Sequence, residues 1–237
     1  MTISVCMASY NGASYVEDQL RSILAFNEVD EVLVSDDGSS DDSAERIKAI
    51  RDSRVRLVAG PRQGLVRNFE FLLSQVQGDY IFLADQDDIW LPGKVPTMMA
   101  HLRCADLVVS DCTVVDERLN TINESFFDLR RSRSGLLHNI MQNSYLGCCI
   151  ALRRQLLDHA LPFPANLPMH DWWLGLVAET FGRPRFIDDR LMLYRRHGGN
   201  ASTTAGSSTT PLLTKLRWRI VLAWALARRR MSRTKGC

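Results

Sequence analysis

Short apolar, β-rich runs alternate with segments of helical spacing over the first 105 residues of the chain. Residues 2–8, 31–35, 55–59 and 79–84 read as strands, and residues 13–26 and 63–77 place apolar side chains at helical spacing. A further helix is expected after residue 40. This β-α-β-α-β-α-β order predicts an α/β fold with a mostly parallel central sheet and helices on both faces.

Three polar loops each follow one of these strands. They begin at Ser9, Asp36 and Asp85. Because ligands of parallel sheets bind at the carboxyl ends of the strands, we expect the three loops to converge on one edge. Ser39, with Asp42 three positions later, predicts a capping box that opens the next helix.

The second half of the chain is less regular. We expect strands at 107–110, 113–115 and 186–195, a mobile loop at 116–134, a helix at 170–181 and a Ser/Thr-rich linker at 201–210. The chain then divides into residues 1–105 and 106–204, which are two halves of one domain, and residues 205–237, which form the linker and a basic tail.

Composition favours a folded cytoplasmic protein. Hydrophobic residues make up 46% of the chain, enough for a sizeable core. The six cysteines include no CxxC pair, and we expect reduced, mostly buried thiols. The N-terminus has no signal-peptide pattern, and no apolar run reaches the roughly 18 residues of a spanning helix.

Asp85-Gln86-Asp87-Asp88 places three carboxylates within four positions, directly after an apolar strand. The mutual repulsion of these groups is relieved by solvent or by a hard divalent cation shared with a diphosphate. The motif therefore indicates either a solvated acidic turn or a metal site.

Three further clusters also leave two interpretations open. Asp36-Asp37-Gly38-Ser39 suits a turn with a helix cap or a contact to a base or ribose. In His170-Asp171-Trp172-Trp173 the carboxylate either caps a helix or, partly desolvated and with a raised pKa, acts as a general base. The run from Tyr194 to Asn200 is either an exposed basic loop or a metal and diphosphate site containing His197.

In their order and spacing these motifs resemble the inverting glycosyltransferases of family 2 with the GT-A fold, and within them the bacterial rhamnosyltransferase branch. The resemblance covers residues 3–200. It rests on Ala8-Ser9-Tyr10-Asn11-Gly12, Ser35-Asp36-Asp37-Gly38-Ser39, Gly64 with Asn68-Phe69-Glu70, the run from Gly78 to Pro92, His170-Asp171-Trp172-Trp173, and Tyr194-Arg195-Arg196-His197. The Gln-x-x-Arg-Trp motif of processive members is absent, which favours transfer of a single sugar.

The resemblance implies a role for each matching position. Asp171 is the expected general base. The expected metal ligands for Mg²⁺ or Mn²⁺ are Asp85, Asp87 and His197. The expected contacts to the nucleotide sugar are Ser9, Tyr10, Asp36, Asp37, Arg67, Asn68, Asp85 and Gln86. Trp90, Trp172 and Trp173 are candidates for the acceptor side, although core packing is the alternative for at least one of them.

The resemblance favours dTDP-rhamnose as donor and a cell-surface polysaccharide or lipid-linked precursor as acceptor. A UDP-sugar enzyme and a catalytically silent sugar-binding module are the alternatives, and the intact set of Asp37, Asp87 and Asp171 argues against the silent module. A nucleotidyltransferase is disfavoured because the chain has no GxxxxGK loop.

The tail is strongly basic. From Pro211 onward the chain has eight basic residues and no acidic ones, interspersed with apolar side chains. The apolar stretch 220–227 is too short to span a bilayer but suits an amphipathic helix at the inner face of the cytoplasmic membrane. The alternative is a helix that packs on the domain or mediates dimerisation. No nucleic-acid-binding module accompanies the basic run, so we expect no nucleic-acid partner.

Overall fold

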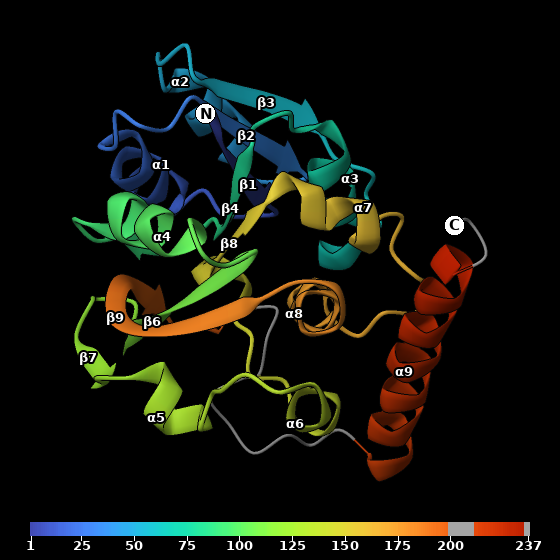
Figure 1. Cartoon of the computed structure of the whole chain (residues 1–237). Helices are drawn as coiled ribbons and strands as arrows, with labels where there is room; N and C mark the ends of the chain where they lie inside the picture. The colour runs from blue at the N-terminus through green and yellow to red at the C-terminus, as the bar shows by residue number, and fades with distance from the viewer. Residues whose placement is uncertain (199–210, 235–237) are drawn as a thin grey trace.

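The computed structural model describes residues 1–198 and 211–234 (Figure 1). Its strands are β1 (Ile3–Ser9), β2 (Glu31–Asp36), β3 (Val55–Ala59), β4 (Tyr80–Asp85), β5 (Ile89–Trp90), β6 (Leu107–Val115), β7 (Thr121–Asn123), β8 (Ile150–Arg153) and β9 (Pro184–Arg195). Its α-helices are α1 (Val16–Leu24), α2 (Ser43–Ala49), α3 (Leu65–Gln75), α4 (Lys94–Leu102), α5 (Phe126–Arg130), α6 (Leu136–Met141), α7 (Leu157–Ala160), α8 (His170–Phe181) and α9 (Leu212–Thr234), with short 3₁₀ turns η1 (Gly147–Cys149) and η2 (Arg154–Leu156). The expected linker at 201–210 lies outside the described residues.

One sheet runs through both halves of the chain in the order β3-β2-β1-β4-β8-β6-β9-β5, with β7 paired to β6. The β1, β2, β3 and β4 strands are parallel neighbours, as the alternating pattern predicts. The β8 strand is antiparallel to both β4 and β6, so the sheet is mixed. Helices cover both faces, with α1 and α4 on one side and α3, α7 and α8 on the other (Figure 1).

Burial along each strand matches its place in the sheet. All seven residues of β1 are buried, because helices cover both faces of this central strand. The β3 strand lies at the edge of the sheet, and none of its five residues is fully buried. The continuous apolar character of 2–8 is therefore the signal of a central parallel strand.

Three local expectations from the sequence are wrong. The segments 107–110 and 113–115 form one strand, β6, whose register with β9 shifts near Asp111. The 116–134 segment is not only loop but contains β7 and α5, since the buried Asp111 carboxylate accepts bonds from Ser125 Oγ at 2.6 Å and from Phe127 N at 3.0 Å. The capping box at Ser39 does not form, because Ser39 Oγ bonds to the Asp36 carboxylate and α2 starts after Asp42 without a side-chain cap.

The α8 helix is apolar almost all round and is packed between the sheet and its neighbouring helices. Trp173 has no exposed surface, and its Nε1 donates to the Ala160 carbonyl at 2.9 Å. Gly175 lies against the Tyr145 ring, where a Cβ would clash. This packing holds the first turn of α8 at the carboxyl edge of the sheet.

We predict that Trp173→Ala lowers the free energy of unfolding by about 3–5 kcal/mol, because it leaves a cavity in the core. Trp173→Phe keeps most of the packing and removes one hydrogen bond, so the loss is smaller, about 1–2 kcal/mol. Urea denaturation followed by circular dichroism measures both. An alanine variant within about 0.5 kcal/mol of the wild type would contradict the core position.

Candidate active site

The three polar loops meet at one edge of the sheet, as the order of strands predicts. They surround a cavity of about 560 Å³ at the carboxyl ends of β1, β2 and β4. The second half of the chain closes it with η1, the first turn of α8 and the end of β9. Of the site residues expected from the sequence, those that line this cavity are Ser9, Tyr10, Asp37, Asn68, Asp85, Gln86, Asp87 and Asp171.

Gln86 ties the acidic loop to the loop after β1. Its Oε1 accepts from Ser9 Oγ at 2.9 Å and from Tyr10 N at 2.8 Å, and its Nε2 donates to the Tyr10 carbonyl at 2.9 Å. A Cβ at Gly12 would collide with the Gln86 amide, which explains the glycine in this loop. These bonds fix the Gln86 backbone, and with it the turn that carries Asp85 and Asp87.

Asp37 and Asp36 have separate structural partners. The Asp37 carboxylate accepts from the backbone N–H of Arg62 at 2.6 Å and of Gly64 at 2.7 Å, so it holds the loop before α3 against the cavity. Gly64 has a φ of +83°, a conformation that favours glycine. Asp36 accepts from Ser39 and does not line the cavity.

Asn68 and Arg67 point in different directions from α3. Asn68 is buried at the cavity wall, where its Nδ2 donates to the Ser35 carbonyl at 3.0 Å and its Oδ1 accepts from Ser35 Oγ at 2.5 Å. Arg67 forms an ion pair with Glu70 and faces the loop around Phe163, outside the cavity. Arg67 therefore does not line the cavity, whereas Arg62, which the sequence did not single out, does.

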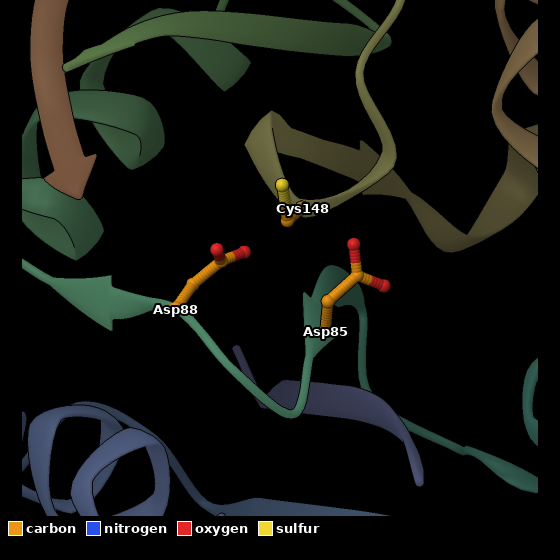
Figure 2. Close-up of side chains that lie close together, drawn as sticks. All are labelled: Asp85, Asp88 and Cys148. Atoms are coloured by element: carbon orange, nitrogen blue, oxygen red, sulfur yellow. The ribbon is translucent and has the colours of Figure 1, made fainter. Parts of the chain in front are cut away.

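Two groups of potential metal ligands surround the acidic turn. In the first, Asp87 Oδ2 lies 2.7 Å from His197 Nε2, and the His197 ring stacks on Tyr15. In the second, donor atoms of Asp85, Asp88 and Cys148 lie within 4.8 Å of one another, with Cys148 on the η1 turn facing both carboxylates (Figure 2). Asp88 is fully buried and accepts from Arg195 N at 3.0 Å, so it anchors the turn to β9.

The electrostatics of the turn suit a cation. Burial raises the pKa of Asp85, and the negative charges of Asp87 and Asp171 raise it further. Burial and the charges of Asp87 and Asp85 likewise raise the pKa of Asp88. A divalent cation would relieve this repulsion, and carboxylates are the side-chain ligands that suit Mg²⁺ and Mn²⁺. Asp85, Asp88 and Cys148 are the side chains whose donor atoms gather within reach of one ion, whereas an ion held by Asp85, Asp87 and His197 stays a proposal.

Asp171 occupies the first turn of α8 and lines the same cavity. Its Oδ1 accepts from Trp172 N at 2.5 Å and from Asn143 Nδ2 at 3.3 Å. Burial raises the pKa of Asp171 to about 6, while hydrogen bonds from Trp172, Asn143 and Gly147 lower it in part. A carboxyl group with this pKa is ionised at neutral pH and can still accept a proton.

His170 was not assigned a role from the sequence, yet its side chain is buried at the cavity wall. The ring stacks on Phe69 at 3.8 Å, and neither ring nitrogen has a hydrogen-bond partner within the described part of the chain. A Cβ at Gly147 would lie 2.7 Å from His170 Nε2. Burial lowers the pKa of His170 to about 3, so the ring is neutral beside Asp171. Only the folded arrangement reveals this, since Phe69 and Gly147 are distant in sequence.

The three tryptophans that were candidates for the acceptor side belong to the interior of the fold. None of them lines the cavity, and all are buried. Trp90 packs near Phe26 and Phe82, and Trp172 Nε1 donates to the Asn139 carbonyl at 2.5 Å. Trp173 belongs to the core described above. Their large apolar surfaces are used in folding.

Comparisons with known proteins agree with this architecture. The sequence profile of Glycosyl transferase family 2 matches residues 4–161. The chain is 26% identical over 220 residues to the dTDP-rhamnosyl transferase RfbG of Shigella flexneri, with 82% of this chain and 72% of that protein covered. It is 30% identical over 183 residues to the UDP-Glc:alpha-D-GlcNAc-diphosphoundecaprenol beta-1,3-glucosyltransferase WfgD of Escherichia coli, with 75% and 70% covered.

Two solved structures share the fold. TarS 1–349 of S. aureus, crystallised with UDP-GlcNAc, superposes with a TM-score of 0.72 at 19% identity, covering 94% of this chain and 66% of that one. The mannosyltransferase PcManGT of Pyrobaculum calidifontis, in complex with GDP-Man and Mn²⁺, gives a TM-score of 0.61 at 19% identity, covering 98% and 64%. The chain thus spans slightly less than two thirds of either solved chain. With the family profile matched over most of its length, the chain belongs to glycosyl transferase family 2 and is a glycosyltransferase with the GT-A fold.

Proposed function

We propose that this chain is an inverting, metal-dependent enzyme that moves one sugar from a nucleotide-sugar donor to a hydroxyl of a saccharide or lipid-linked acceptor. One observation carries the proposal: the carboxylates of Asp85, Asp87 and Asp171, contributed by the two halves of the chain, line one cavity. This arrangement suits a reaction in which one part of the cavity holds a diphosphate and another removes a proton.

The nucleotide would lie against the loops after β1 and β2. Ser9, Tyr10 and Asp37 line this side of the cavity, beside the Arg62–Gly64 loop that Asp37 holds. The solved relatives that bind UDP-GlcNAc and GDP-Man support a nucleotide sugar as the ligand class.

Asp85, Asp87 and His197 would hold Mg²⁺ or Mn²⁺. When bound, the ion would offset the negative charge that develops on the departing diphosphate. The Mn²⁺ in the PcManGT complex supports this cofactor class.

Asp171 would act as the general base. Its carboxylate takes the proton from the acceptor hydroxyl while that oxygen bonds to the anomeric carbon. The bond from the anomeric carbon to the diphosphate breaks with its electron pair, and the nucleoside diphosphate leaves. Attack on the face opposite the leaving group inverts the configuration. Burial of Asp171 keeps its pKa high enough for this transfer.

The finer specificity that we propose is rhamnose from dTDP-rhamnose, with a growing cell-surface polysaccharide or its lipid-linked precursor as acceptor. The similarity to RfbG supports this donor. The similarity to WfgD supports a UDP-sugar as the second candidate.

We also propose that the chain works in the cytoplasm, at the inner face of the cytoplasmic membrane. Among the helices of residues 1–198 and 211–234, none combines the length and hydropathy needed to cross a bilayer. Peripheral contact through the basic tail would place the cavity near a lipid-linked acceptor.

We expect Asp171→Asn to lower kcat by about 10²–10⁴-fold, because the amide cannot take the acceptor proton. Donor binding should change little, since Asp171 lies in the half of the chain opposite the nucleotide loops. Transfer from dTDP-rhamnose to an isolated polysaccharide precursor measures the first, and calorimetry with the nucleotide measures the second. Asp189→Asn, at an exposed position on β9, is the matched control.

Asp171→Asn with most of its activity would remove Asp171 from the base role. Wild-type transfer from a UDP-sugar but not from dTDP-rhamnose would contradict the rhamnose proposal and leave the mechanism intact.

The pH dependence follows from the environment of Asp171. The base must be ionised, so kcat/KM should fall as the pH drops through about 6. Asn143 donates to the carboxylate and lowers its pKa. Asn143→Ala should therefore shift this fall in kcat/KM to higher pH, by roughly half to one pH unit for one hydrogen bond. Asn27→Ala, at an exposed position, is the control. If the fall in kcat/KM stays at the same pH or moves to lower pH in Asn143→Ala, the result would contradict Asp171 as the general base.

A further inference from the structure

The α9 helix packs on the domain through one face only. Leu222, Ala225 and Leu226 are buried in this contact. Arg219 donates to the Met141 carbonyl of α6 at 2.8 Å, and Arg229 donates to the Leu161 carbonyl at 2.6 Å. Figure 1 shows α9 along the side of the molecule, beside α6 and α8. Docking on the domain, one of the alternatives for the tail, thus accounts for one face of the helix.

The opposite face of α9 is an exposed apolar stripe. Leu213 is 81% exposed, Ile220 60%, Trp224 59% and Met231 57%. At 100° per residue, these positions lie within about 40° of one another and about 160° or more from Leu222. The stripe runs over roughly 27 Å, at 1.5 Å per residue. A helix that only packed on its own domain would have polar side chains here.

Basic side chains border this stripe. Arg217 and Arg228 are exposed, and the Arg228 guanidinium lies over the Trp224 ring at 4.6 Å. The α9 helix has no acidic residue. The neighbouring α6 also carries two exposed apolar side chains, Leu137 at 80% and Met141 at 59%. The outward stripe of α9 and its arginines form a surface with an apolar centre and a positive border.

We propose that this surface, the outward stripe of α9 with Arg217 and Arg228, lies in the interface of an anionic lipid leaflet. The inference rests on the proposed function and assigns its membrane contact to particular side chains. A bilayer interface offers acyl chains to the stripe and anionic headgroups to Arg217 and Arg228. A second copy of this chain is a poor occupant, since a symmetric contact would bring two basic helices together.

The contact also orients the catalytic half of the molecule. The inward face of α9 touches α8, where the guanidinium of Arg229 lies 5.9 Å from the centre of the Trp173 ring. Asp171 is in the first turn of the same α8 helix. A leaflet bound to the outward face would therefore hold the element that carries the candidate base at a fixed position relative to the lipid.

The test is sedimentation of the full chain with vesicles. Vesicles of phosphatidylcholine and phosphatidylglycerol in equal parts should bind the wild type, and vesicles of phosphatidylcholine alone should bind it much more weakly. Ile220→Ser with Trp224→Ser should weaken binding by about tenfold or more. Arg217→Gln with Arg228→Gln should weaken it by roughly 10- to 30-fold and reduce its dependence on salt. Ile122→Ser is the matched control, because Ile122 on β7 is 59% exposed and lies outside this surface.

Wild-type affinity in the Ile220→Ser, Trp224→Ser variant would overturn the proposal, as would a wild type that binds neither vesicle. A dimer in analytical ultracentrifugation that this variant abolishes would assign the stripe to a second copy and also overturn it. Nucleotide binding is measured on the same samples, so that failure of the membrane proposal can be distinguished from failure of the proposed function. Loss of vesicle binding with nucleotide binding intact affects only the surface, and absence of nucleotide binding in the wild type affects only the proposed function.

Discussion

Several carboxylates lie close together at a partly desolvated site, and the rest of the structure holds them there. Asp85, Asp87 and Asp171 line one cavity, and the pKa of Asp85 and of Asp171 is raised chiefly by burial. Such a group of like charges opposes folding unless a cation or a proton neutralises it. Because the fold retains these carboxylates despite their cost in stability, we infer that it is organised around a ligand that binds them. The Asp87–His197 contact brings the end of β9 to the turn after β4 and so links the two halves of the chain.

The surrounding hydrogen bonds make this arrangement rigid before any ligand arrives. Gln86 fixes the acidic turn to the loop after β1, and Asp37 fixes the loop before α3. Asn143 and the first turn of α8 orient Asp171. Preorganised groups of this kind need little reorientation during the reaction, because folding has already fixed their orientation. The core tryptophans contribute indirectly, by holding α8 against the sheet.

The sequence predicts the parallel half of the sheet well because both faces of its central strand are buried, which leaves a continuous run such as residues 2–8. It also predicts the convergence of the polar loops, since strand polarity alone determines it. It fails where long-range contacts decide the local structure. Asp111 orders α5 through Ser125 and Phe127, and no local pattern marks that contact. The tryptophans enter the core through contacts with residues distant in sequence, although their motif positions suggest contact with ligands. The closeness of Asn143 to Asp171 and of His170 to Gly147 appears only when α8 is packed beside η1.

The central proposal is that Asp87 and His197 would hold a metal ion that binding of a nucleoside diphosphate also requires. Calorimetric titration of dTDP and of UDP, with and without Mn²⁺, tests it most directly. We predict binding of one of the two that weakens by about tenfold or more without Mn²⁺, and loss of this metal dependence in Asp87→Asn and His197→Ala. A folded wild-type protein that binds neither nucleotide with Mn²⁺ present, or an Asp87→Asn variant that keeps the full metal dependence, would contradict the account.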